Sequence, residues 1–373
     1  MPRVLFGDCS AAGISLAAHR RHSRIGARAL GLIALACVLA SCGGDDGDRA
    51  TEYVTLNYPL AAPGGSTLLT GVRGVDDSAD VFISGFYASP APDSVDTGLI
   101  YKGPATGGGT WYTLNYPSSP GATVVNTALY GPNNDGAGGV TVVGNYTTEE
   151  AGAGTPIGLL YQGPLDGSGT WQTLDPPDSN GTIAHSNMGG LIVGNYVTQG
   201  APTGHAFVYD IESDTYSELV KPGAVSITAY GIWHNGGSSY TIAGGYTELG
   251  HSTGYLVDWN SAARTASNWT SFKYKNAEQE PALLSHFEGI TSDGDGGYNL
   301  ASDLLVADTG LAVQATFVHV PRTASGSFGE AMWTDLAYPD STLTSANTVY
   351  QRIVLGIYQT GTGVSSGYVA TVP

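Results

Sequence analysis

The chain has 373 residues and a formal net charge of −18, although only 12% of its residues are charged. The first 41 residues carry five arginines against one acid, Asp8, a net charge of +4, so the rest of the chain carries −22. Such acidity disfavours nucleic acid as a partner, because its binding rests on neutralising phosphates with Lys and Arg. It also disfavours docking of the protein surface on anionic lipid.

Cysteine is confined to the N-terminal end of the chain. Cys9, Cys37 and Cys42 are the three cysteines, and none follows residue 42. The body therefore has no disulfide framework and no thiolate metal site, and no cofactor is indicated. We expect packing and strand pairing alone to hold it together.

A basic segment, 1–28, precedes an apolar run, 29–42, which suits the hydrophobic region of a signal peptide and is too short to span a bilayer. The run ends in Leu39-Ala40-Ser41-Cys42, which resembles the lipobox of bacterial lipoproteins. The resemblance implies cleavage before Cys42, acylation of its sulfur and stable anchoring in the membrane. An ordinary secretory signal cut near Ser41 is the alternative.

The residues that follow define the remaining boundaries. Gly43, and not Asp, comes directly after the cysteine, which by the same resemblance favours the outer membrane. We therefore expect a signal peptide at 1–41, a lipidated Cys42 with a flexible Gly/Asp-rich tether over 42–50, and a folded body at 51–373.

The body repeats four strand-length patterns in a fixed order. The first is a Trp/Tyr-x-x-Leu-x-Tyr-Pro phrase, and the second is a more variable apolar stretch such as 124–130. The third ends in Gly-x-Tyr, with glycines at 85, 144, 194, 244 and 356 and Ser302 in the odd slot, and the fourth resembles Gly-Leu-Ile-Tyr at 98–101. No segment shows sustained helical periodicity.

This order predicts an all-β fold, a six-bladed β-propeller of four-stranded blades. The body begins with the first pattern, 53–58, and ends with the fourth, 367–372, so the N-terminal strand should complete the last blade. A linear solenoid is the alternative, but it needs capping units that the sequence lacks. The repeats also resemble the HAF-type extracellular repeats of bacterial surface proteins, through HAFVY at 205–209 and Gly-Asn-Tyr at 144–146 and 194–196.

Several short motifs invite a chemical interpretation, but each has a simpler structural one. The turns before Trp111 and Trp171 resemble degenerate Asp boxes of sialidase-like propellers, which are structural. A sialidase also needs an arginine triad, and the body arginines, Arg49, Arg73, Arg264, Arg322 and Arg352, form no recognisable motif.

The serine-hydrolase pattern Gly-x-Ser-x-Gly at 363–367 leads into a strand and lacks the helix that it requires. The calcium-like stretches at 133–136 and 293–297 fit hairpin turns better, and the second has Leu304 where a calcium loop needs Glu. The body histidines show no metal-binding spacing; they are His185, His205, His234, His251, His286 and His319.

The strand order places two sets of loops on one face of the ring, at 60–65, 118–121 and 276–282 and at 88–97, 147–156 and 248–253. We expect this face to bind a protein or glycan partner, with Tyr87, Tyr146 and Tyr196 at its edge, unless these tyrosines pack between blades. No catalytic motif is evident, so the sequence predicts a non-enzymatic, lipid-anchored binding or scaffolding module. The alternatives are a surface adhesin or polysaccharide-binding protein, and a glycan-acting enzyme, which a clustered acid pair in the channel would favour.

Overall fold

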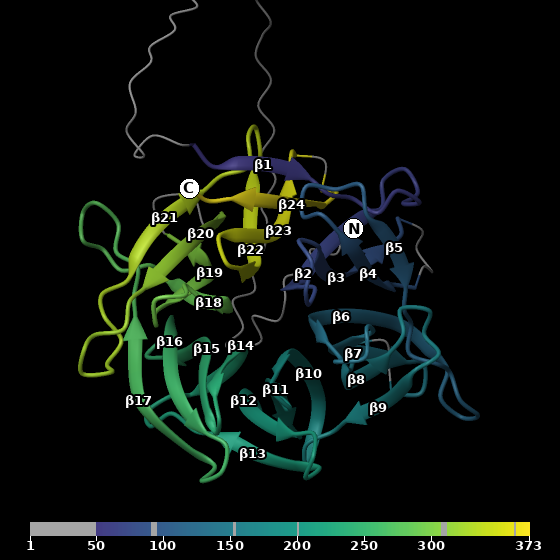
Figure 1. Ribbon diagram of the computed structural model, residues 1–373, viewed down its shortest axis with the longest axis horizontal. Coiled ribbons are helices and arrows are strands. Elements are labelled where there is room, and N and C mark those ends of the chain that lie inside the picture. Colours follow the sequence, from purple (N-terminus) through teal and green to yellow (C-terminus); the bar gives the residue numbers. More distant parts are fainter. Residues whose placement is uncertain (1–49, 91–94, 152–153, 200, 307–311, 362) are drawn as a thin grey trace, which may run out of the picture.

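The computed structural model describes residues 50–373, except 91–94, 152–153, 200, 307–311 and 362. The signal peptide, Cys42 and nearly all of the tether lie outside the described residues. Within the described part, every regular element is a β-strand, and the strands are arranged radially around an axis (Figure 1). Among these residues there is no helix long and apolar enough to cross a membrane.

The strands fall into four classes by their place in each sheet. The innermost are β2 (Ser66–Gly74), β6 (Val124–Asn134), β10 (Ser179–Met188), β14 (Ser226–Gly236), β18 (Leu284–Ser292) and β22 (Leu343–Tyr350). The second are β3 (Val81–Ala88), β7 (Val140–Thr148), β11 (Leu191–Thr198), β15 (Ser239–Glu248), β19 (Tyr298–Leu305) and β23 (Ile353–Gln359). The third are β4 (Thr97–Gly103), β8 (Ile157–Gly163), β12 (Ala201–Asp210), β16 (His251–Asn260), β20 (Val313–Val320) and β24 (Ser366–Thr371). The outermost are β5 (Thr110–Thr113), β9 (Thr170–Leu174), β13 (Thr215–Leu219), β17 (Thr265–Phe272), β21 (Met332–Leu336) and β1 (Glu52–Thr55).

Hydrogen bonding groups these strands into four separate four-stranded sheets and one eight-stranded sheet. The four are β2–β5, β6–β9, β10–β13 and the sheet β22-β23-β24-β1. The eight-stranded sheet contains β14–β17 and β18–β21, which are joined where β16 pairs in parallel with β18 at Ser252↔Leu284 and Thr253↔Ser285. The prediction of an all-β propeller with four-stranded blades is confirmed.

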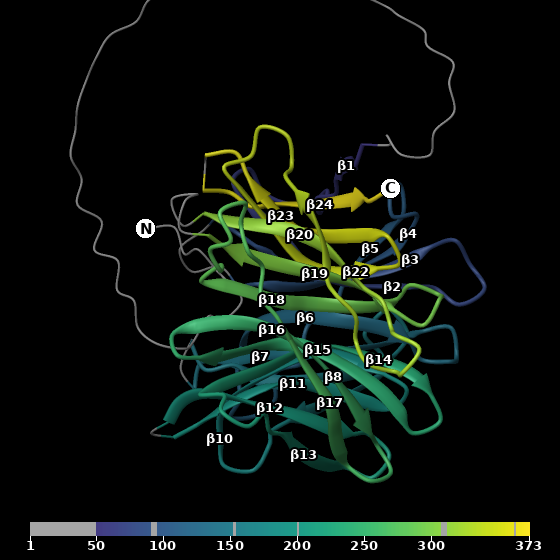
Figure 2. The same ribbon diagram turned by 90° about the vertical axis from the view of Figure 1, so that its left-hand side faces the viewer.

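The N-terminal strand closes the ring as predicted. β1 pairs antiparallel with β24, from Glu52↔Thr371 to Thr55↔Tyr368, and so becomes the outermost strand of the sheet that holds the last strands of the chain. In both views β1 lies beside the C-terminus (Figures 1 and 2). The two ends of the body are thus held together by strand pairing, with no disulfide.

The innermost strands surround an axial channel. Each contacts the next around the ring, β2 with β6, β6 with β10, and so on through β14, β18 and β22 back to β2. Consecutive strands are antiparallel, so the connections from each innermost strand to the second strand of its sheet all lie at one end of the channel. We call this end the hairpin face. The loops that enter the innermost strands and those that join second to third strands lie at the other end, the loop face.

The Gly-x-Tyr glycines have a steric origin. A Cβ atom at Gly85, Gly144, Gly194, Gly244 or Gly356 would overlap a backbone carbonyl of the neighbouring innermost strand. Only glycine fits this close approach without a shift of the backbone. The exception is Ser302, whose Oγ donates a hydrogen bond of 2.7 Å to the His286 carbonyl oxygen in the corresponding place.

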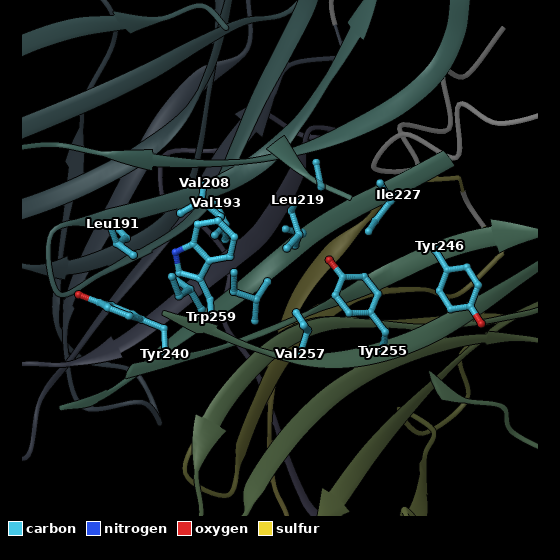
Figure 3. Packing of buried hydrophobic residues seen from close by; sticks show 14 residues of the cluster. Leu191, Val193, Val208, Leu219, Ile227, Tyr240, Tyr246, Tyr255, Val257 and Trp259 are labelled. Carbon is cyan, nitrogen blue, oxygen red and sulfur yellow. The ribbon is translucent and has the colours of Figure 1, made fainter. Parts of the chain in front are cut away.

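The hydrophobic core lies between sheets. In the cluster of Figure 3, Leu191 and Val193 of β11 and Val208 of β12 face Tyr240 of β15 and Trp259 of β16. All five side chains are buried. Since each sheet packs both faces against its neighbours, the ring and not the single sheet is the unit that buries apolar surface.

Candidate active site in the axial channel

Every innermost strand has a β-bulge midway along its length. The register of these strands against their neighbours skips a residue in each strand, and in β6 it skips Gly131 as well. We call the skipped residues the bulge ring; they are Thr70, Tyr130, His185, Tyr230, Glu288 and Asn347. Four of them, Thr70, His185, Tyr230 and Glu288, line a cavity of about 20 Å³ in the channel. Bulges redirect side chains, and here they direct the ring residues to the axis.

One arc of the bulge ring is aromatic. The ring centroids of Tyr130 and His185 are 5.3 Å apart, and those of His185 and Tyr230 are 4.7 Å apart. The arc continues to His286, whose centroid lies 5.3 Å from that of Tyr230. His185 Nε2 and Asn195 Oδ1 are 2.7 Å apart, a hydrogen bond that fixes the imidazole.

Next to this arc lies an acid centre, formed by His286, Glu288 and Asp303. His286 Nε2 is 2.5 Å from Glu288 Oε1. Asp303 is on β19, directly opposite His286 in the strand register. Its carboxyl group accepts hydrogen bonds of 2.7 Å from the Ala346 N–H and from Ser345 Oγ, both on the adjacent strand β22.

Burial gives these groups different protonation states. Burial, together with the charge of Glu288, raises the pKa of Asp303 to about 7. For His286, burial lowers the pKa, but the charge and hydrogen bond of Glu288 and the charge of Asp303 outweigh it, so the pKa is raised. Burial lowers the pKa of His185 to about 4, so its ring is neutral at neutral pH. Glu288 thus lines the cavity in contact with a histidine, and Asp303, on the neighbouring strand, is a carboxyl group that keeps a proton close to neutrality, an arrangement suited to acid and base roles.

The described parts of the predicted binding loops lie on the loop face, whereas 91–94 and 152–153 lie outside the described residues. Large apolar side chains are exposed in these loops or beside them: Leu60, Val95, Val220, Val225, Leu249 and Leu283. Leu60 and Leu249 are 78% and 91% exposed.

The tyrosines of the Gly-x-Tyr motif pack between neighbouring elements. Tyr146 stacks on Tyr116 with ring centroids 3.8 Å apart, and the two hydroxyls lie 3.0 and 2.9 Å from Thr173 Oγ1. Tyr87 Oη accepts a hydrogen bond of 2.8 Å from the Ala62 N–H. Tyr196 stacks on the His205 ring at 5.1 Å. These contacts show that the three tyrosines pack within the protein, the alternative to partner binding that the sequence left open.

The calcium-like stretches are hairpin turns. Asp293 Oδ1 accepts hydrogen bonds of 2.8 Å from the Asp295 and Gly297 N–H groups, and Asp293 Oδ2 is 2.9 Å from His319 Nε2. Asp135 Oδ1 accepts bonds from two N–H groups in the equivalent turn. No group of three or more His, Cys, Asp or Glu side chains that could hold a metal ion occurs in the part of the chain that the structure describes.

The other motifs are structural as well. The segment 363–367 leads into β24 rather than a helix, and Ser365 is buried. The Asp-box-like turns join third strands to outermost strands. In these turns the Tyr101 and Tyr161 hydroxyls accept hydrogen bonds from the Gly109 and Gly169 N–H groups. Trp111 and Trp171 pack on these same tyrosines.

The sequence missed the acid centre. Glu288 and Asp303 lie within strands and belong to no recognisable sequence motif. The available signal was the failure of the repeat, which has Ser302-Asp303-Leu304 where the other units have Gly-x-Tyr. His286 could not be distinguished from the other body histidines without its partners.

No model of a known protein family matches the chain, and no curated protein matches it. Among solved structures it is similar to the α-L-arabinanase of Penicillium chrysogenum complexed with arabinobiose, with a TM-score of 0.52, 15% identity, and coverage of 86% of this chain and 98% of that one. It is less similar to a GH43 β-1,3-galactosidase with galactodeoxynojirimycin, with a TM-score of 0.42, 10% identity, and coverage of 74% and 95%. The α-L-arabinanase of Cellvibrio cellulosa complexed with arabinohexaose has a TM-score of 0.34, 12% identity, and coverage of 74% and 95%.

These findings correct the prediction of a non-enzymatic binding or scaffolding module. The first of these solved structures is an α-L-arabinanase, so an enzyme is built on this fold. At 15% identity the first likeness shows the fold alone, and the TM-scores of the other two are too low to argue from. The prediction was wrong because it rested on the absence of a catalytic motif from the sequence, and an active site need not carry one.

Proposed function

We propose that the protein is a glycan-acting enzyme that hydrolyses glycosidic bonds at the acid centre. The observation that carries the proposal is a pair of carboxyl groups on either side of His286: Glu288, which contacts His286 and lines the cavity, and Asp303, which lies opposite His286 in the strand register. Glycoside hydrolysis needs one carboxyl group that protonates the leaving oxygen and one carboxylate that acts as base or nucleophile. The pKa of about 7 suits Asp303 to the first role. Glu288, which lines the cavity and contacts His286, is placed for the second.

The geometry also suggests where a glycan would lie. The Glu288 side chain is 18% exposed, so solvent reaches its carboxylate. The cavity of about 20 Å³ at the bulge ring admits a water-sized group but no sugar ring. The glycan would therefore lie across the mouth of the channel on the loop face and present the bond to be cleaved to the acid centre from above.

The experiment is to incubate the full chain with arabinan, arabino-oligosaccharides and galactan, and to measure the release of reducing ends. The arabinanase similarity makes arabinan the first substrate to test. Asp303→Asn and Glu288→Gln should each abolish the release. Asp293→Asn is the matched control, because it removes another histidine-paired carboxylate from a turn on the hairpin face. Binding without cleavage by the wild type would leave a polysaccharide-binding protein and refute the enzyme.

We also propose that the body is held at the outer membrane by acylated Cys42. The lipobox-like sequence supports this, and the first described strand begins at Glu52, ten residues later. A Cys42→Ser variant should leave the membrane fraction. Protease digestion on intact and permeabilised cells would then distinguish a surface position from a periplasmic one.

Finally, we propose that the ring has six blades and belongs with the HAF-type repeats. Within the eight-stranded sheet, β14–β17 and β18–β21 each follow the strand order of the separate sheets, and only two residue pairs join them. Counting them as two blades agrees with the six copies of the repeated phrase. A crystal structure in which those strands formed one continuous blade would refute the count.

A further inference from the structure

The hairpin-face end of the channel holds a buried arginine. Arg73 lies near the end of β2, three residues beyond the bulge at Thr70, and it lines the cavity in the channel. It is only 9% exposed, and its Nε has no hydrogen-bond partner among the described residues. Leaving a buried charge unpaired is costly, so proteins almost always supply a counter-charge.

None of the ion pairs among the residues that the structure describes joins a carboxylate to Arg73. Within the described ranges, the only arginine in an ion pair with an acid is Arg322, with Asp258. Glu288 lines the same cavity, but its carboxylate is paired with His286. Burial lowers the pKa of Arg73 only to about 10, so its guanidinium stays charged at neutral pH.

Arg73 also reaches across the channel. Its guanidinium carbon is 5.0 Å from the centroid of the Trp233 ring on β14. In the ring of innermost strands, β6 and β10 separate β2 from β14 on one side, and β18 and β22 do so on the other. The contact therefore spans the axis, and the positive charge lies at the centre of the channel.

The walls around this charge leave little space. Gly131, Gly231 and Gly289 line the cavity, and a Cβ atom on any of them would collide with the adjacent innermost strand. These close approaches narrow the channel to a cavity of about 20 Å³. Such a space admits a single ion or water molecule but no larger group.

We propose that the cavity beside Arg73 is a binding site for one small monovalent anion of the halide class, which supplies the counter-charge of the guanidinium. The proposal is independent of any enzymatic activity. In this proposal, the Arg73–Trp233 contact and the bound anion together close the channel at the hairpin face.

The test compares the full chain in chloride or bromide with the same chain in gluconate, which is too large for the cavity, at constant ionic strength. Halide should raise the Tm of the wild type by roughly 2–4 °C. Arg73→Met should abolish this dependence. Arg352→Met should retain it, because Arg352 also stacks on an aromatic ring, that of Phe317, but its Nε donates to the Val372 carbonyl oxygen at 3.0 Å.

Crystals of the wild type soaked in bromide give a second test that needs no variant. An anomalous peak in the channel beside the Arg73 guanidinium is expected. Peaks confined to the outer surface, which would mean an adventitious ion only, or an Arg73 Nε that donates to a protein oxygen, would overturn the proposal. If Arg73→Met fails to fold, the bromide position in the wild type decides the question.

Discussion

Two regions built on the same plan show how this fold separates packing from chemistry. In the sheet β6–β9, the second strand reads Gly144-Asn145-Tyr146, and in β18–β21 the same slots hold Ser302-Asp303-Leu304. A Cβ on Gly144 would overlap the Ala128 carbonyl oxygen, whereas the Ser302 hydroxyl makes a hydrogen bond in the corresponding place.

The bulge ring differs in the same way. Tyr130 of β6 contributes to the aromatic arc, whereas Glu288 of β18 contributes a carboxylate. Tyr146 is fixed by stacking, but Leu304 packs in a small cluster with Ala282 and Val306. The regular sheet uses these positions for packing, and the irregular one has exchanged packing for acids. The departure from the repeat at 302–304 thus coincides with the buried carboxyl groups of the acid centre.

The largest expected effect is on catalysis. Asp303→Asn keeps the hydrogen-bonding shape of the side chain but cannot deliver a proton, so we expect the rate of glycan hydrolysis to fall by about 10²–10⁴-fold. The wild-type rate should decline as the pH rises through about 7, where Asp303 loses its proton. Steady-state rates across this pH range check both statements. An unchanged profile in Asp303→Asn would remove Asp303 from the mechanism.

A second prediction breaks the regular sheet instead. Gly144→Ala introduces a Cβ where the Ala128 carbonyl oxygen lies, so we expect it to lower the free energy of unfolding by about 3 kcal/mol or more. Ser302→Ala removes only a hydrogen bond and should cost about 1 kcal/mol. Denaturant titrations measure both. Equal losses of stability in the two variants would show that positions 144 and 302 have the same steric restriction, which would contradict the comparison.

The acid centre should also make stability depend on pH. The pKa of Asp303 is raised in the folded protein, so the native state holds its proton more tightly than the unfolded chain does. Its stabilising contribution is fully present below the unfolded pKa of about 4 and is lost as the pH rises through about 7. The raised pKa of His286 acts in the same direction above about pH 6.5.

His185 acts in the opposite sense, because its pKa is lowered to about 4, so its neutral native form gains stability as the pH rises from about 4 to about 6.5. In the wild type the two contributions oppose each other between about pH 4 and pH 6.5. Asp303→Asn removes the falling contribution, so its free energy of unfolding should rise more steeply with pH over this range than that of the wild type. Thermal unfolding at a series of pH values tests this, and the same dependence on pH in both proteins would contradict the assignment to Asp303.

The smallest expected effect concerns the tyrosine stack. Thr173→Val removes the partner of the Tyr116 and Tyr146 hydroxyls and should cost about 1 kcal/mol of stability. Asp335 of β21 occupies the place of Thr173, and Leu304 of β19 occupies the place of Tyr146. Leu304 has no hydroxyl group for Asp335 to bind, so Asp335→Ala should change stability by less than about 0.5 kcal/mol. Chemical denaturation distinguishes the two. A larger loss in Asp335→Ala would refute the comparison.

The fold was predictable because its constraints repeat. Glycine recurs at 85, 144, 194, 244 and 356 since a carbonyl oxygen excludes a side chain there, and the order of the patterns implies that the strand near Tyr53 pairs with the last one. The candidate site was not predictable in the same way. Glu288 and Asp303 are 15 positions apart in the sequence, and both are linked to His286, Asp303 by strand register and Glu288 by a side-chain contact. Ser345, which donates a hydrogen bond to Asp303, lies in another sheet. A single sequence records neither the register nor the bulge that turns Glu288 to the axis.

The pairing of β1 with β24 also sets an order of assembly. β1 is made first, yet its partner strand is among the last parts of the body to be made, so β1 has no partner until every intervening strand has been synthesised. Until β24 is made, the ring is an open arc in which β1 has no partner and β23 has an unpaired edge, the kind of edge that invites association with other chains. A chain cut short before β24 would stay in that state. Only a chain that includes β24 can therefore pair β1 and β23 through it and close the ring.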